Sequence, residues 1–154
     1  MRIITGLIEA HIVRIANEKV EFLLLQRAPS EKYPNIWQMV TGKIKPNEKA
    51  YETAIREIKE ETNLDISEIF VVPKTNSFYS EIDDTIMQIP VFVATVKNEE
   101  LLTLSEEHTK YKWVDIKKAN KLLAWPGQKE SAKIIKDFFE RKYKSLNFIK
   151  IPIR

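Results

Sequence analysis

Three glutamates, Glu57, Glu60 and Glu61, stand close together in a segment whose apolar residues recur at helical spacing. On a helix, Glu61 lies about 40° from Glu57 around the axis, and Glu60 lies about 60° from Glu57 on the other side. Like charges at this spacing destabilise a helix by a few tenths of a kcal/mol per pair, and a bound cation removes that penalty. Carboxylate oxygens are the ligands that Mg²⁺ and Mn²⁺ prefer. The glutamates therefore predict a divalent-metal site, and the alternative is a solvated helix face.

The residues around these glutamates form a longer pattern with fixed spacing. It runs Gly42, five residues, Glu48, seven residues, Arg56-Glu57-Ile58, one residue, Glu60-Glu61, one residue, Asn63-Leu64. This pattern resembles the signature of the Nudix hydrolases at every position but one, since Asn63 stands where the family has glycine. Asparagine is the next most permissive residue in the left-handed backbone region, so the departure is small. Glu48 and Arg56 are expected to form a structural ion pair that steadies the start of the helix.

The resemblance implies a hydrolase that cleaves nucleoside diphosphates linked to another group, folded as an α/β/α sandwich with a mixed sheet. It also implies that Glu57 and Glu61, with Glu60 in support, bind Mg²⁺, or Mn²⁺ in its place. The backbone of Gly42 is then expected to lie close to the metals. These are the roles that the family gives to the matching positions of this sequence.

Further residues outside the signature are similar to the bacterial dATP or dihydroneopterin triphosphate pyrophosphohydrolases of this family. They are Gln26-Arg27, the run Trp37-Gln38-Met39-Val40-Thr41-Gly42, Glu107-His108, and the run Tyr111-Lys112-Trp113-Val114-Asp115. By this resemblance Glu107 supplies a metal ligand, or the catalytic base, from a loop that faces the helix. His108 is expected to make a structural hydrogen bond rather than to bind the metal, because Mg²⁺ sites rarely use imidazole. Residues 70–98 carry no motif of this group.

Five side chains are candidates for contact with the substrate: Arg27, Trp37, Gln38, Lys43 and Phe78. Arg27 would pair with phosphates as a planar fork, and the alternative is an exposed arginine at a strand end. Trp37 and Phe78 would stack on a base or a pterin ring, although a place in the core is the commoner role of such aromatic residues. Gln38 and Lys43 lie within or beside the run that is similar to the pyrophosphohydrolases.

The expected reaction is an in-line attack of a metal-activated water on a phosphorus of dATP or dihydroneopterin triphosphate, giving a monophosphate and pyrophosphate. The catalytic residues would be Glu57, Glu61 and Glu107, with either Glu61 or Glu107 taking the proton of the water. Alternative substrates within the family are diadenosine polyphosphate, ADP-ribose and the 5′-triphosphate of RNA. The alternative of another class is a domain that binds a nucleotide without hydrolysing it. Such domains often lose signature glutamates, and all of them are present in this chain.

The elements that must position these residues follow from the hydrophobic patterning. Strands are expected over residues 3–15 and 20–26 as a hairpin, over 37–41, over 69–80 and 85–97 as a second hairpin, and over 111–114. Helices are expected from an N-cap at Asn47 to Asn63, over 115–123, and from 128 to about 143, and the tail 148–153 should dock as a strand or staple. This irregular alternation predicts an α+β or α/β protein whose mixed sheet is flanked by helices.

Composition bounds the class of protein. The 154 residues fit one domain spanning 1–154, with 44% apolar and 31% charged residues. The net charge of +3 comes from 25 basic and 22 acidic residues that are interspersed, which favours a small-molecule partner over nucleic acid. The absence of cysteine excludes disulfides, thiolate metal sites and thiol nucleophiles. The apolar run at residues 3–8 is too short for a membrane span or a signal peptide, so a cytoplasmic protein without membrane contact is expected, and its oligomeric state does not follow from the sequence.

Overall fold

The structure is a computed structural model that describes residues 1–141 and 149–153. Its strands are β1 (Arg2–Ile4), β2 (Leu7–Ala16), β3 (Lys19–Arg27), β4 (Trp37–Gln38), β5 (Val40–Lys43), β6 (Asp65–Ser80), β7 (Thr85–Lys97), β8 (His108–Val114) and β9 (Lys150–Ile151). Its helices are α1 (Ala50–Thr62), α2 (Ile116–Leu122) and α3 (Pro126–Arg141), and a 3-10 turn, η1, spans Glu99–Leu101. Within the described residues, no helix is both long and apolar enough to cross a membrane.

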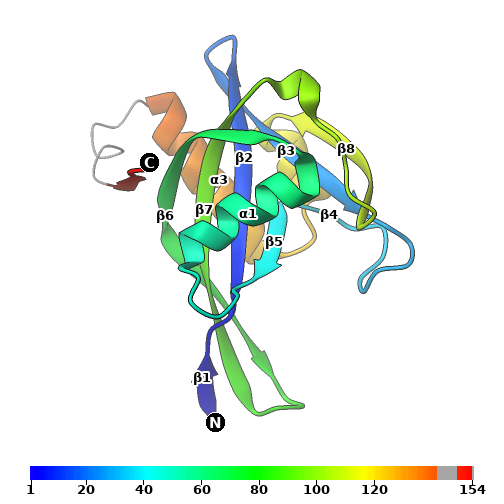
Figure 1. The fold of residues 1–154 in the computed structure, drawn as a ribbon, viewed down its shortest axis with the longest axis vertical. Coiled ribbons are helices and arrows are strands. Elements are labelled where there is room, and N and C mark those ends of the chain that lie inside the picture. The colour runs from blue at the N-terminus through cyan, green and yellow to red at the C-terminus, as the bar shows by residue number, and fades with distance from the viewer. Residues whose placement is uncertain (142–148, 154) are drawn as a thin grey trace.

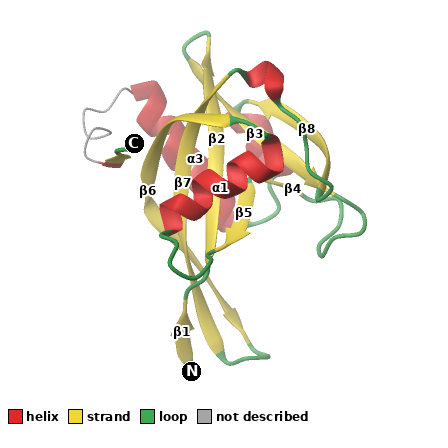
Figure 2. Cartoon of the chain, in the orientation of Figure 1, coloured by secondary structure: helices red, strands yellow, loops and turns green. Residues whose placement is uncertain are grey.

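The strands form one mixed sheet in the order β4-β3-β2-β7-β6-β9, with β8 also paired to β3, β5 to β2 and β1 to β7. Strands β1 and β2 each run parallel to their neighbour β7. The other pairings of named strands are antiparallel. Helix α1 crosses one face of the sheet, while α2 and α3 cover the other face (Figures 1 and 2). The prediction of a mixed sheet flanked by helices is therefore confirmed.

A core lies on each side of the sheet, because the alternate residues of the central strands are apolar in both directions. Ile8, Ala10 and Ile12 of β2 pack with Ala54 and Ile58 of α1 on one side. The other side holds a second cluster, in which Val13, Phe22 and Leu24 pack with residues of α2 and α3. The sheet thus separates a face that carries α1 from a face that carries α2 and α3.

The first strand differs from the prediction, because residues 3–15 form two strands rather than one. Gly6 separates β1 from β2 with a φ of 148°, a conformation that other residues rarely adopt. Residues 37–41 also divide, so that β4 pairs with β3 while β5 pairs with β2. A chain that changes partner within a few residues keeps its apolar pattern, which is why the sequence does not reveal the break.

The ends of α1 follow the sequence in part. Asn63 adopts the left-handed conformation at φ 62°, as expected for the residue that closes the helix. The predicted N-cap at Asn47 is wrong, since Asn47 is itself left-handed at φ 67° and the helix is capped at Lys49. A capping residue needs an extended backbone, which Lys49 has. Glu52 accepts a hydrogen bond from the Lys49 backbone N–H at 3.0 Å, so this glutamate ties the first turn to the cap.

The C-terminal part of the chain agrees with the predictions where the structure describes it. Helix α3 begins at Pro126, two residues before the predicted start, because proline is accepted at the first helical position. Its predicted end near residue 143 lies outside the described residues. Strand β9 pairs with Ile69 and Phe70 of β6, as expected for a docked tail, and Phe148 is likewise not described.

Candidate active site

Glu61 occupies a position of α1 that faces the protein interior. Ala54, Ile58 and Glu61 recur at helical spacing along the buried stripe of the helix, and Glu61 is only 3% exposed. Its carboxyl group therefore stands where an apolar side chain is normally found. The atom Oε2 of Glu61 is buried and has no hydrogen-bond partner among the described residues. A buried acidic oxygen left without a partner is unfavourable for folding, and a bound cation would supply such a partner.

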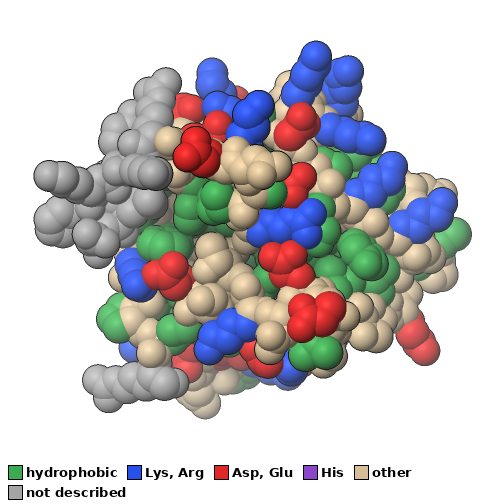
Figure 3. Space-filling view, turned by 90° about the horizontal axis from the view of Figure 1, so that it is seen from above, with side chains coloured by type: hydrophobic (Ala, Val, Ile, Leu, Met, Phe, Trp, Pro, Cys, Tyr) green, Lys and Arg blue, Asp and Glu red, His purple; other side chains and the backbone are tan. Residues whose placement is uncertain are grey.

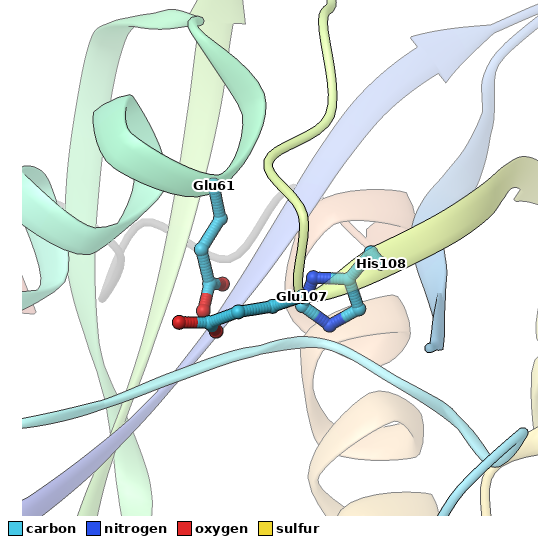
Figure 4. Close-up of side chains that lie close together, drawn as sticks. All are labelled: Glu61, Glu107 and His108. Atoms are coloured by element: carbon cyan, nitrogen blue, oxygen red, sulfur yellow. The ribbon is translucent and has the colours of Figure 1, made fainter. Parts of the chain in front are cut away.

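Glu107 reaches Glu61 from the loop that precedes β8. The backbone N–H groups of Thr103 and Ser105 donate to the carbonyls of Thr62 and Glu61 at 3.0 and 3.2 Å, which fixes the loop on the last turn of the helix. The carbonyl of Glu107 accepts from the Ala28 N–H at 2.8 Å. One ligand atom each of Glu61, Glu107 and His108 lie within 4.8 Å of one another (Figure 4). The loop and the helix thus bring together two carboxylates that are far apart in the sequence.

Two carboxyl groups of the site, those of Glu61 and Glu57, have raised pKa values. Burial raises the pKa of Glu61 from its ordinary value of 4.5 to about 10, and the charges of Glu107 and Glu57 add to this rise. Burial also raises the pKa of Glu57, although the neighbouring Arg56 opposes the rise. The positive charge of Arg27 likewise lowers the pKa of Glu61, against the effect of burial. Such raised pKa values are typical of a functional site built to receive a cation.

Arg56 connects the loop before α1 to the carboxylates on it. Its guanidinium donates to both carboxylate oxygens of Glu48 at 2.8 and 3.0 Å and to the carbonyl of Lys43 at 3.0 Å. The same guanidinium donates to Glu57 at 2.6 Å and to Glu60 at 3.2 Å. The Arg56 side chain holds the pKa of Glu48 down at about 2, so this carboxylate stays charged. A planar fork with several donors suits this position better than a lysine would.

Gly42 lies directly against Glu57. A Cβ atom placed on Gly42 would overlap Cγ of Glu57 and would lie 2.6 Å from its Cδ and 2.9 Å from Oε1. Only glycine leaves room for this carboxylate, so the strand end and the helix touch through backbone and carboxyl group. Hard cations bind through carboxylate oxygens, which Glu57 supplies here beside the Gly42 backbone and which Glu61 and Glu107 supply nearby. The residues present therefore fit Mg²⁺ or Mn²⁺.

His108 is buried beside the carboxylates but is bound to Gln38. Its Nε2 atom lies 3.2 Å from the amide nitrogen of Gln38, which is itself 5% exposed. Because an amide nitrogen only donates, Nε2 accepts and the ring proton is on Nδ1. Burial lowers the pKa of His108 to about 4, so the ring is neutral at pH 7. Gln38, which was predicted to contact the substrate, therefore contacts His108 beside the carboxylates.

The family described as NUDIX domain matches residues 7–138, which is most of the chain and includes every carboxylate of the cluster. The chain belongs to the Nudix family. Glu107, which the signature does not contain, falls inside the matched region of this Nudix domain together with Gly42 and α1.

Several hydrolases are similar to this Nudix protein over most of its length. The asymmetrical bis(5′-nucleosyl)-tetraphosphatase of Mus musculus is 31% identical over 116 residues, which span 72% of this chain and 75% of the mouse protein. The dihydroneopterin triphosphate diphosphatase of Haemophilus influenzae is 36% identical over 110 residues, which span 63% of this chain and 66% of that protein. The structure of a Caenorhabditis elegans Ap4A hydrolase in a binary complex has a TM-score of 0.73 at 25% identity and covers 88% of this chain and 96% of its own.

Of the predicted substrate residues, Arg27 lies near the carboxylates of this Nudix site, whereas Lys43 lies on the other face of the sheet. Arg27 follows Leu23 and Leu25 on the face of β3 that packs against α1, and its charge acts on both Glu61 and His108. Its Nε donates to the carbonyl of Lys32 at 2.7 Å, which holds the guanidinium at the strand end. Lys43 is exposed and pairs with Leu7, while Gly42 pairs with Ile8, whose side chain faces α1. Because successive residues of a strand face opposite sides of the sheet, the Lys43 side chain lies on the face away from α1.

The two predicted aromatic residues are not brought to the carboxylates. Gln26 pairs with Trp37, whereas Leu25 pairs with Gln38, and paired residues share a face of a sheet. Trp37 therefore lies on the face of α2 and α3, where it packs against the core and Lys112 sits 4.9 Å from its ring. Phe78 pairs with Met87 near the far end of the β6–β7 hairpin. The idea that these rings stack on the substrate at the cluster is not supported by their positions.

Sequence reasoning missed a second group of buried polar residues beneath α3. Glu9 and His11 of β2 are 4% and 1% exposed, and Glu9 accepts a hydrogen bond from the amide of Asn76 at 3.0 Å. Glu9, His11 and Gln128 each keep at least one buried polar atom without a partner among the described residues. The signal was the alternation of β2, where Ile8, Ala10 and Ile12 face α1 and the polar residues between them must face the other core.

Binding of metal at the cluster is expected to release protons. The pKa of Glu61 lies near 10 in the folded protein without metal, so this carboxyl group is protonated at pH 7 and must lose its proton to bind a cation. The affinity for Mn²⁺ should therefore rise with pH, by up to about tenfold per pH unit for one proton. Calorimetric titration with Mn²⁺ in buffers of different ionisation enthalpy measures the released protons. Equal heats in all buffers would contradict the expectation, and the variant Glu61→Gln should release fewer protons.

Proposed function

We propose that this Nudix protein is a metal-dependent hydrolase of a nucleoside polyphosphate, with Glu57, Glu60, Glu61 and Glu107 holding Mg²⁺ or Mn²⁺. The observation that carries the proposal is the convergence of Glu61 and Glu107 around a buried oxygen that has no hydrogen-bond partner in the described part of the chain. Glu57 supplies a further carboxylate. It is held between the guanidinium of Arg56 and the backbone of Gly42. A purely structural helix would not bury a lone carboxyl group in this way.

The proposed reaction divides between the cations and the side chains. When bound, divalent cations neutralise the phosphate oxygens and lower the pKa of a nearby water. Either Glu61 or Glu107 takes the proton from the attacking water, while the P–O bond to the leaving phosphate breaks. Arg27 stands at the edge of the cluster and would pair with phosphate oxygens away from the reacting phosphorus.

The substrate class that we place first is a dinucleoside tetraphosphate, cleaved to a nucleoside triphosphate and a monophosphate. The relatives named asymmetrical bis(5′-nucleosyl)-tetraphosphatase, such as the mouse protein, match the larger share of this chain. The site is also open toward solvent, since Glu60 and Glu107 are exposed and the Glu60 side chain is 54% exposed. An open site accepts a polyphosphate that carries a bulky group at each end.

The second candidate is a triphosphate such as dATP or dihydroneopterin triphosphate, cleaved to a monophosphate and pyrophosphate. The Haemophilus influenzae diphosphatase has the higher identity of the two relatives described, at 36%. On the face seen in Figure 3, acidic and basic side chains are interspersed, which suits a small anionic substrate better than a long nucleic acid. We therefore keep both small-molecule classes ahead of RNA with a 5′-triphosphate.

A substrate panel tests the proposal. The full chain with Mg²⁺ is incubated with diadenosine tetraphosphate, dATP, dihydroneopterin triphosphate, ADP-ribose and 5′-triphosphate RNA, and products are separated by anion-exchange chromatography. We expect ATP and AMP from diadenosine tetraphosphate at the highest kcat/KM. Pyrophosphate release from a triphosphate at a higher kcat/KM would favour the second candidate. Absence of turnover on the whole panel, together with measurable nucleotide binding, would support a binding domain and contradict the hydrolase.

A further inference from the structure

An arm of three strands extends from the body of the molecule (Figure 1). It consists of β1, the end of β6 and the start of β7, with Phe78 of β6 and Ile4 of β1 both paired to Met87. Neither α1 nor α3 covers this part of the sheet in the view of Figure 1. The arm lies at the pole away from the β2–β3 turn, and neither apolar cluster of the described residues includes Ile4, Phe78 or Met87.

The outer edge of the arm is a strand without a neighbour. Residues 75–80 of β6 pair with β7 on one side. On the other side β9 pairs only with Ile69 and Phe70, so in the described part of the chain residues 75–80 face no strand there. Alternate N–H and C=O groups of this segment therefore point away from the sheet. Such an edge is a template for a further strand.

The segment lacks the features by which soluble proteins protect an exposed edge. Prolines, charged residues and bulges commonly block pairing at such edges. Pro73, Lys74 and the register shift between Val71 and Thr75 supply these features at the start of the edge. Residues 75–80, with the sequence Thr-Asn-Ser-Phe-Tyr-Ser, carry neither a charge nor a proline. Phe78 and Tyr79 within it are 52% and 54% exposed.

We propose that this edge pairs antiparallel with the same edge of a second copy of the chain, forming a homodimer about a two-fold axis near Ser77 and Phe78. The charges at the two ends support this partner. Lys74 stands at the start of the segment, where its ammonium also contacts Glu130 and Asn76 of its own chain, and the turn that follows the segment carries Glu81 and Asp83. An antiparallel pair brings the basic end of each copy toward the acidic turn of the other, whereas a parallel pair would place like charges together. The self-complementary edge thus selects a second copy as its occupant.

Pairing of this kind has two physical gains. The free backbone groups of both copies acquire hydrogen bonds, and the aromatic rings of Phe78 and Tyr79 gain cross-strand neighbours. The carboxylate cluster lies on the body at the end of α1, apart from the arm, so each copy keeps an open site (Figure 1). The dimer is therefore independent of the catalytic proposal.

Analytical ultracentrifugation of the full chain over a range of concentrations tests the dimer. We expect a concentration-dependent dimer in the parent chain and at least a tenfold weaker dimer in the variant Phe78→Lys. The matched control is Ile15→Lys, which changes an apolar residue of similar exposure, 53%, at the opposite end of the molecule. This control should dimerise as the parent does. A monomer at all concentrations, or a dimer that Phe78→Lys leaves unchanged, would overturn the proposal.

A cross-linking experiment locates the contact independently of folding effects. Because the chain contains no cysteine, a single introduced cysteine reports on one position only. The variant Ser77→Cys should give a covalent dimer with a short bifunctional maleimide, since residue 77 lies beside the proposed axis. The variant Lys19→Cys, at an exposed position of the opposite pole, should not. Equal cross-linking of the two variants would show that the copies do not meet at β6.

Discussion

Replacing Glu61 with glutamine is expected to stabilise the protein without metal and to remove most of its hydrolase activity. In the folded state Glu61 has a pKa of about 10 against an ordinary value of 4.5, so the native state binds more protons than the unfolded state between these values. The free energy of unfolding therefore falls as the pH rises through this window. Glutamine keeps the shape of the side chain but cannot ionise. We expect Glu61→Gln to raise the free energy of unfolding at pH 8 by roughly 1–3 kcal/mol.

The loss of activity in Glu61→Gln follows from the same burial. The neutral amide would neither hold a cation as a carboxylate does nor accept a proton from water, so kcat/KM should fall by about 10²–10⁴-fold. The matched control is Glu60→Gln, in the same turn of α1, because the Glu60 side chain is 54% exposed. This control should leave the free energy of unfolding nearly unchanged. Urea unfolding at pH 6 and pH 8 in a chelating buffer, beside rates on the preferred substrate, measures both effects.

Two results would contradict this account of Glu61. One is a stability of Glu61→Gln equal to that of the parent protein at pH 8, which would mean that the carboxyl group is not strained by burial. The other is an unchanged kcat/KM, which would remove Glu61 from the catalytic machinery. The pair of measurements also separates Glu61 from Glu107. Glu107 is exposed, so Glu107→Gln should lower activity without the gain in stability.

The sequence predicts the elements of this fold better than their partners. Helix α1 and its left-handed end at Asn63 follow from apolar spacing and from the backbone freedom of asparagine, both of which are local properties. The division of the first strand at Gly6 depends instead on β1 and β2 pairing with β7 at separate places. Pairing between distant segments leaves little trace in a single sequence, because the apolar pattern shows which face of a strand is buried but not which strand lies beside it.

The same distinction explains which site residues could be predicted. The carboxylates of α1 are recognisable because helical geometry fixes their spacing, and Glu107 required the resemblance to a family. Trp37 and Gln38 are neighbours in the sequence, yet they lie on opposite faces of the sheet. To predict that Trp37 stacks on the substrate, one must know which face of the sheet its side chain occupies. Only the pairing of β4 with β3 determines that face. Glu9 was overlooked for a similar reason, since its partner Asn76 comes from β6.

Replacing Gly42 with alanine is expected to disable the site through a single methyl group. The added Cβ would overlap Cγ of Glu57 and lie 2.6 Å from Cδ, so the carboxylate must move away from its place between Gly42 and Arg56. Displacement of a catalytic group by about 1 Å lowers rates by about 10²-fold, and kcat/KM should fall by a similar factor. Overpacking of this kind also lowers the free energy of unfolding by about 1–3 kcal/mol.

The matched control for Gly42→Ala is Gly127→Ala, at the start of α3 on the other face of the sheet. Its Cβ would lie 2.6 Å from Oδ1 of Asn76, so it also overlaps the end of a side chain, less tightly than at Gly42 and away from Glu57, Glu61 and Glu107. Comparable losses of stability in the two variants, with a loss of activity only in Gly42→Ala, would trace the effect to the position of Glu57. If both variants lost activity in proportion to their stability, the glycine would be required for packing alone. The contact between Gly42 and Glu57 would then have no role in catalysis, although glycine at this position would still be needed for the strand to approach the helix.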